Sequence, residues 1–146
     1  MRKRGARVTD LIVLIVSATE GVKRQTQEVI DLIIKDQIPT IVAINKIDLP
    51  HADVEGVEDS LFEAGLSIEP KGGNIPVIHI SAKTGQNVDL LSGLILEETS
   101  DLKAFTSGQA EAIVLEAYQT EKGLNAMTLI VKQGILNNGS ILIIGD

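Results

Sequence analysis

The sequence predicts an α/β domain built on a parallel sheet, followed by the start of an antiparallel β-barrel domain. Two observations support this fold class. Over the first two-thirds of the chain, short β-branched apolar runs alternate with segments whose apolar residues recur at helical spacing. After about Glu98 the alternation ends, and the later apolar runs have no helical pattern between them.

Three short apolar runs are the predicted strands of the parallel sheet. They are residues 11–16 (LIVLIV), 40–44 (TIVAI) and 76–80 (PVIHI). Runs of this length and composition are typical of strands that are buried on both faces of a parallel sheet. We therefore expect helices to cover both sides of it.

A helical stripe follows each of these runs. In each stripe the residues recur at helical spacing, such as i, i+3, i+4 and i+7 in the first, which places them on one helix face. The members are Thr26, Val29, Ile30 and Ile33 in the first stripe, Val54, Val57 and Leu61 in the second, and Val88, Leu91, Leu94 and Ile95 in the third. The resulting order β-α-β-α-β-α predicts a doubly wound arrangement with right-handed crossovers.

The chain is predicted to divide into residues 1–98, a linker at residues 99–108 (TSDLKAFTSG), and residues 109–146. The linker prediction depends on its polar, Ser/Thr-rich composition. In the last part we expect strands at 110–118, 126–132 and 140–144, with a turn at Asn137-Asn138-Gly139 before the third. Three strands are few for an independent sheet, so we expect this second domain to be incomplete.

Composition and charge exclude several classes of protein. The 146 residues include no Cys, which excludes disulfides, thiolate zinc sites and a cysteine nucleophile, and only two His. The net charge of −7 argues against direct binding to DNA or another nucleic acid by this segment. No apolar run approaches the roughly 20 residues that cross a bilayer, so no membrane association is expected.

Two polar motifs follow the second and third predicted strands. Asn45-Lys46-Ile47-Asp48 comes directly after the second strand, and Ser81-Ala82-Lys83 comes directly after the third. Ligands of open parallel sheets bind outside the carboxyl ends of the strands, so both motifs are well placed for binding. A simple strand-end turn is the alternative, because Asn and Asp favour turns.

The two motifs resemble the guanine-recognition pair of the GTPase superfamily. The resemblance implies that the Asp48 carboxylate accepts guanine N1–H and N2–H₂, while the Ala82 N–H donates to O6. It also implies that Asn45 bridges N7 and a neighbouring loop and that Ser81 braces that loop. The stems of Lys46 and Lys83 would lie on the two faces of the base, with their ammonium groups in solvent.

The sequence does not contain the phosphate-binding pattern Gly-x-x-x-x-Gly-Lys-[Ser/Thr]. No Asp-x-x-Gly precedes the first strand either. In the superfamily these elements lie upstream of the region with the two motifs. We therefore expect residues 1–98 to be the later part of a P-loop GTPase domain, and we assign no catalytic residue and no metal ligand to this sequence.

A more specific resemblance extends over essentially the whole chain. The sequence is similar to the translation initiation factor two family of bacteria and organelles. The matching segments are residues 1–6 (MRKRGA), 8–10 (VTD), 21–22 (GV), 25–26 (QT), 72–77 (GGNIPV), 81–85 (SAKTG), 97–103, 134–136 (GIL) and 138–140 (NGS). Glu20 stands where the family usually has Asp, and residues 123–125 (GLN) depart from its usual Gly-Arg-Gly.

This resemblance implies a ribosome-associated GTPase that helps to place initiator tRNA and to join the ribosomal subunits. Its ligands would be GTP and GDP, with Mg²⁺ held by residues outside this sequence. It implies a bacterial cytoplasm or a mitochondrial or plastid matrix. The alternatives are another translational GTPase, such as a specialised elongation factor, and a nucleotide-free module that docks on the ribosome or a partner.

Three other features are given structural interpretations. His79 lies within the third predicted strand and is expected to be a hydrogen-bonded sheet residue, and His51 is expected to be solvated. The acidic background at residues 53–63 is interpreted as a solvated helix face rather than a metal site. Gly72-Gly73 is interpreted as a turn.

Overall fold

A computed structural model describes residues 9–100 and 107–145 of the chain. The basic N-terminal residues with the motif at residues 1–6, and most of the predicted linker, lie outside these described residues. The chain divides after residue 101 into two units, which are described separately. The predicted domain limits at residues 98 and 108 stay a prediction.

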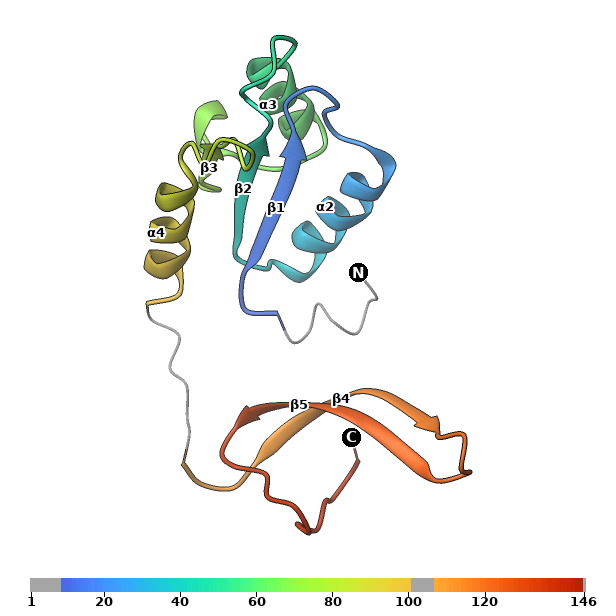
Figure 1. The fold of residues 1–146 in the computed structure, drawn as a ribbon. Helices are drawn as coiled ribbons and strands as arrows, with labels where there is room; N and C mark the ends of the chain where they lie inside the picture. The colour runs from blue at the N-terminus through green and yellow to red at the C-terminus, as the bar shows by residue number, and fades with distance from the viewer. Residues whose placement is uncertain (1–8, 101–106, 146) are drawn as a thin grey trace. The chain divides into compact units, whose positions relative to one another are not determined.

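The first unit contains a three-stranded parallel sheet with strand order β1-β2-β3 (Figure 1). The strands are β1 (Ile12–Ser17), β2 (Thr40–Asn45) and β3 (Val77–His79). In the register, Ile12 lies opposite Thr40 and Val42 lies opposite Val77. The parallel sheet is confirmed, with each strand within two residues of its predicted limits.

The helices are α2 (Arg24–Asp36), α3 (Val54–Glu63) and α4 (Val88–Glu98), with a 3₁₀ turn η1 (Glu69–Lys71) before β3. Asp53 caps α3, because its Oδ1 accepts the backbone N–H of Gly56 at 2.9 Å. All three helices occur where the apolar stripes predict them. The observed order of strands and helices is therefore β-α-β-α-β-α.

The hydrophobic core lies on one face of the sheet. Alternate residues of β1 and β2, such as Leu14 and Ile44, pack there with Ile30 and Ile33 of α2 and with Leu61 of α3. β2 is buried on both faces, as predicted, and all its residues from Thr40 to Ile44 are buried. A central strand with neighbours on both sides accounts for this burial.

The prediction that the first strand is buried on both faces is wrong for the described residues. Leu14 and Val16 of β1 are buried, whereas Ile15, between them, is 60% exposed. β1 lies at the edge of the sheet, so its second face has fewer neighbours than that of β2.

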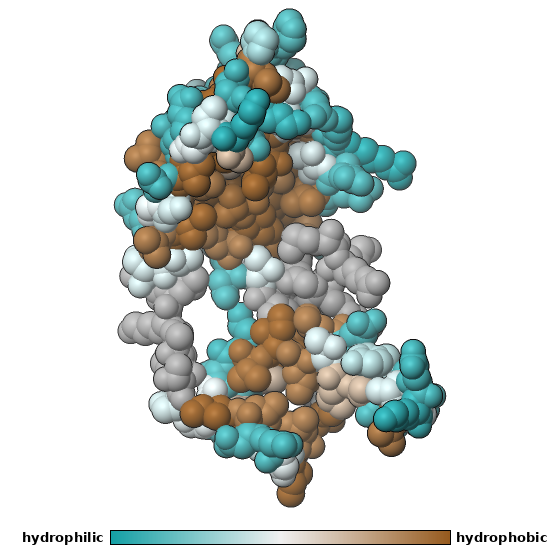
Figure 2. Space-filling view, viewed as in Figure 1, coloured by the Kyte–Doolittle hydropathy of each residue, from teal (hydrophilic) through white to brown (hydrophobic). Residues whose placement is uncertain are grey.

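Leu96 of α4 is 71% exposed, and Figure 2 shows apolar residues gathered on the viewed face of this unit.

The second unit is an antiparallel hairpin of β4 (Glu111–Gln119) and β5 (Asn125–Gln133). Its turn is closed by the Gly123 N–H donating to Thr120 O at 2.8 Å and by the Thr120 N–H donating to Leu124 O at 2.8 Å. The departure from the family pattern at residues 123–125 therefore does not prevent the hairpin. The register shifts between Val114 and Glu116, a bulge of the kind that increases local twist.

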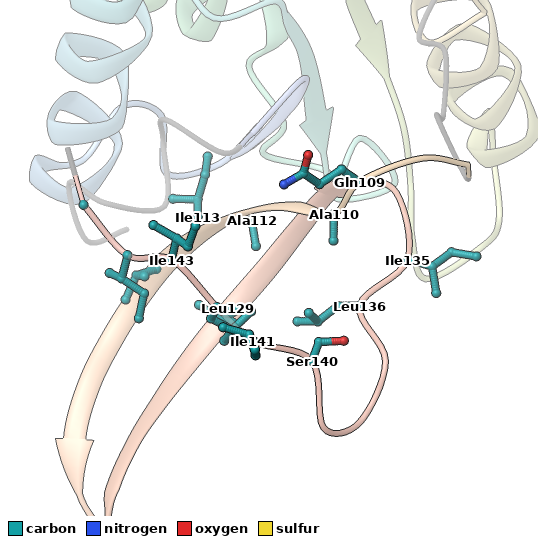
Figure 3. Close-up of a pocket in the computed structure, with 14 residues that line it drawn as sticks. Gln109, Ala110, Ala112, Ile113, Leu129, Ile135, Leu136, Ser140, Ile141 and Ile143 are labelled. Carbon is teal, nitrogen blue, oxygen red and sulfur yellow. The ribbon is translucent and has the colours of Figure 1, made fainter.

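The predicted third strand at residues 140–144 is wrong for the described part of the chain. This segment has no strand partner there, and Ile143 is 95% exposed. A strand needs a neighbouring edge to accept its hydrogen bonds, and alternating apolar residues alone do not supply one. The segment instead lines a cavity of about 820 Å³ with hairpin residues such as Ile113 and Leu129 (Figure 3).

Candidate functional site

The two polar motifs lie side by side at the carboxyl ends of β2 and β3. Backbone hydrogen bonds join the strand ends, with the Ile80 N–H donating to Ile44 O at 2.8 Å and the Ile47 N–H donating to Ile80 O at 3.4 Å. Parallel pairing of β2 and β3 thus brings together the tetrapeptide motif at residues 45–48 and the tripeptide motif at residues 81–83, which are more than 30 residues apart in the sequence.

Asn45 links the two loops through a single side-chain oxygen. Its Oδ1 accepts the backbone N–H of Lys46 at 2.7 Å and that of Ala82 at 3.0 Å. The predicted donor to guanine O6, the Ala82 N–H, is therefore engaged within the protein. A guanine base bound here would have to share the Ala82 N–H with Asn45 Oδ1, or displace Asn45 Oδ1 from it.

Ser81 joins the loops a second time. It is fully buried, its hydroxyl donates to Asp48 Oδ1 at 2.7 Å, and its Oγ accepts the N–H of Thr84 at 3.2 Å. The hydrogen bond from Ser81 holds the pKa of the Asp48 carboxyl below its usual value, and the charge of Lys83 acts in the same direction. Asp48 is therefore an oriented, ionised acceptor at neutral pH.

Lys46 has an unusual backbone conformation and a fixed ammonium group. Its φ of 70° lies in the left-handed region, which is unfavourable by about 1–2 kcal/mol for a residue with a Cβ. Its Nζ donates to Glu20 Oε1 at 2.9 Å. Glu20 also pairs with Lys23, the residue that precedes α2. Two lysines thus share one carboxylate.

These two lysines should make Glu20 an unusually strong acid. Hydrogen bonds and charge from Lys23 and Lys46 lower the pKa of Glu20 from 4.5 to about 2. Because the folded-state pKa is depressed, the stabilisation from this group is present above about pH 4.5 and is lost as the pH falls towards 2. A carboxyl-detected NMR titration should place the Glu20 midpoint at about 2, and a midpoint at the ordinary value of 4.5 would contradict this.

The predicted positions of Lys83 and of the Lys46 stem against a base stay predictions. Lys83 is exposed beside Asp48 and acts on it through its charge. The hydrogen bonds within the two loops do not determine whether the methylenes of Lys46 and Lys83 would lie against the faces of a bound base. The close pairings are those of Asn45 with Ala82 and of Ser81 with Asp48.

The prediction that the acidic residues at 53–63 form a solvated face is wrong for Glu58. Its side chain is only 12% exposed, and Oε1 lies 2.8 Å from His79 Nε2. Asn87 Nδ2 donates to the carbonyl of His79 at 2.8 Å, so β3 is held on both sides just before the second loop. The sequence contained a signal for this burial, because Glu58 is four residues after Val54 and three before Leu61 and therefore shares the apolar face of the helix.

Among residues 9–100 and 107–145, no three His, Cys, Asp or Glu side chains gather where they could hold a metal ion. Within the same residues, no helix has the length and apolar composition to span a membrane.

The parallel sheet with its helices is like that of a P-loop GTPase domain, the class of α/β domain that the fold indicates. Comparison with known proteins specifies the class further. The family model "Elongation factor Tu GTP binding domain" matches residues 1–122. Translation initiation factor IF-2 of Rickettsia felis is 43% identical over 149 residues, which include the whole of this chain and 18% of that protein.

Two solved structures are also similar. Translation elongation factor SelB from Methanococcus maripaludis, in its apo form, has a TM-score of 0.67 and 28% identity over 92% of this chain and 29% of its own. GDP-bound aIF5B from Aeropyrum pernix has a TM-score of 0.64 and 26% identity over 91% of this chain and 28% of its own. The chain belongs to the family of elongation factor Tu GTP binding domains, and over its whole length it is similar to a translation initiation factor IF-2.

Proposed function

We propose that this chain supplies the guanine-recognition site of a translation initiation factor GTPase. The observation that carries the proposal is the joining of the two loops by Ser81 and Asn45, which brings the Asp48 carboxylate to the same edge as the Ala82 N–H that Asn45 Oδ1 accepts. The GDP in the related aIF5B structure supports a guanine nucleotide as the ligand.

The chemistry of the site favours guanine over adenine. The two oxygens of Asp48 can accept N1–H and N2–H₂ of guanine together, while the Ala82 N–H donates to O6. Adenine has no matching donor pair and carries an amino group in place of O6. It would leave a charged acceptor unpaired, which corresponds to a preference for guanine of about a hundredfold or more.

In this proposal, the wider activity belongs to the larger protein. The chain spans 18% of the IF-2 relative, and the phosphate-binding pattern is not in its sequence. GTP hydrolysis with Mg²⁺, contact with the ribosome and with initiator tRNA, and subunit joining therefore depend on other residues. A bacterial cytoplasm, or an organelle matrix, is the proposed location.

The proposal is tested in an exchange protein, defined as the full-length Rickettsia relative in which this chain replaces the matching stretch. We expect the exchange protein to bind GDP at least about a hundredfold more tightly than ADP in competition measurements. Equal affinity for the two nucleotides would contradict guanine recognition by these loops.

The chain by itself is expected to bind GDP only weakly. Base contacts alone lack the phosphate interactions that supply much of a nucleotide's affinity. Calorimetry with GDP should therefore show no binding in the micromolar range. Micromolar or tighter binding by the 146-residue chain would show that it holds phosphates by other means.

A specialised elongation factor is the second candidate, because SelB is as similar in structure as aIF5B. The 43% identity to IF-2 over the whole chain favours the initiation factor. Ribosome-binding assays with initiator and elongator tRNA distinguish the two candidates when they use the natural full-length protein that contains this chain, since an initiation factor should stimulate initiator tRNA binding alone.

A further inference from the structure

We propose that Glu20 is a positioning residue for guanine recognition, which acts by holding the ammonium group of Lys46. The inference rests on the proposed function, because it needs Lys46 to lie against a bound base. Glu20 itself is not proposed to contact the base. It lies in the turn after β1, 26 residues from Lys46 in sequence.

The turn that carries Glu20 is fixed directly to the nucleotide loop. The Ala18 N–H donates to the backbone oxygen of Asn45 at 2.7 Å, one residue before Lys46. The N–H of Gly21 donates to Ser17 O at 2.9 Å and closes the turn around Glu20, with Gly21 at a φ of 63°. The backbone therefore holds the carboxylate beside the second strand end.

Lys46 is held at both ends of its side chain. At the backbone, its N–H donates to Asn45 Oδ1 at 2.7 Å in the left-handed conformation. At the tip, Nζ donates to Glu20 Oε1 at 2.9 Å. A long side chain that is already ordered loses less conformational entropy when a base packs on its methylenes.

Glu20 keeps its charge over the physiological range, and Lys23 supports it from the other side. Lys23 pairs with the second carboxylate oxygen, Oε2, which leaves Oε1 to Lys46. The side chains of all three residues are partly exposed, so salt should weaken the interaction. The expected effect on nucleotide binding is correspondingly modest.

The test measures dissociation of a fluorescent GDP analogue from the exchange protein. Glu20→Gln should speed dissociation about two- to fivefold, the range for a partly exposed ion pair. Glu20→Asp, which keeps the charge, should restore part of the slower rate. The matched control is Glu28→Gln, because Glu28 is an exposed carboxylate that pairs with Arg24 at 3.5 Å, away from Lys46.

A double-mutant cycle shows whether Glu20 acts through Lys46. Lys46→Met should speed dissociation, and adding Glu20→Gln to it should have no further effect. A merely structural role for Glu20 would instead give the same increase in both backgrounds and lower the thermal midpoint. High salt should reduce the effect of Glu20→Gln in the protein with Lys46.

Each contrary outcome identifies what fails. If Lys46→Met speeds dissociation but Glu20→Gln does not, the positioning role is wrong and the proposed function stands. If Glu20→Gln slows dissociation, Glu20 competes with the nucleotide for Lys46, and the inference is reversed. If Lys46→Met has no effect, packing of Lys46 on the base is wrong, and the role of Glu20 falls with it.

Discussion

Replacing Asp48 with Asn should change the nucleotide preference of the exchange protein from guanine to xanthine. The carboxylate accepts two hydrogen bonds from guanine, whereas an amide presents one acceptor and one donor. Xanthine carries an oxygen at C2 in place of the amino group, so the amide NH₂ can donate to it. We expect GDP affinity to fall by about a hundredfold or more and xanthosine diphosphate to bind better than GDP.

The structure explains why the amide should be correctly oriented. The Ser81 hydroxyl donates to Oδ1 of residue 48 at 2.7 Å, and an amide oxygen can accept the same hydrogen bond. Its NH₂ group then faces the ligand. Competition between the two nucleotides measures the change, with Asp59→Asn as the matched control, because Asp59 pairs with Lys71 outside the site. Unchanged selectivity for GDP would refute the role of Asp48.

Replacing Gly73 with Ala should strongly destabilise the first unit. An added Cβ would overlap the backbone carbonyl of Ser67, which a side-chain rearrangement cannot relieve. The same carbonyl accepts the N–H groups of Asn74 at 2.9 Å and Ile75 at 3.0 Å, just before β3. Moving it therefore disturbs the entry to the strand that carries the second loop. We expect a loss of at least about 3 kcal/mol.

Denaturant unfolding of the chain measures this loss. Gly93→Ala is the matched control, because an added Cβ there meets open space within helix α4. It should stabilise the chain by about 0.5–1 kcal/mol, since alanine is the better helix former. If the two variants unfold at the same denaturant concentration, the close approach at Gly73 does not constrain the fold.

Much of the first unit could be predicted because its signals are local. A buried run such as residues 40–44 and a stripe such as Val54, Val57 and Leu61 contain their own periodicity. The motifs after the strands could be placed for a related reason, since parallel strands bring their carboxyl ends to one edge. The elements and the pair of loops follow from those local patterns.

Predictions failed where the outcome depended on neighbours. The run at residues 140–144 has the composition of a strand but no strand partner among the described residues. Ile15 has the apolar character of a buried residue but lies on an edge strand and is exposed. Hydrogen bonding and burial at these positions are properties of the assembled sheet and are not encoded in the run itself.

The sequence by itself determined the α/β class, the order of the elements and the two loops, because these depend on residues within a few positions of one another. Only the tertiary structure decided how the site is held. It pairs Glu20 with Lys46 across 26 residues, Ser81 with Asp48 across 33, and Glu58 with His79 across 21. Such contacts arise from the packing of separate elements, so no local pattern specifies them.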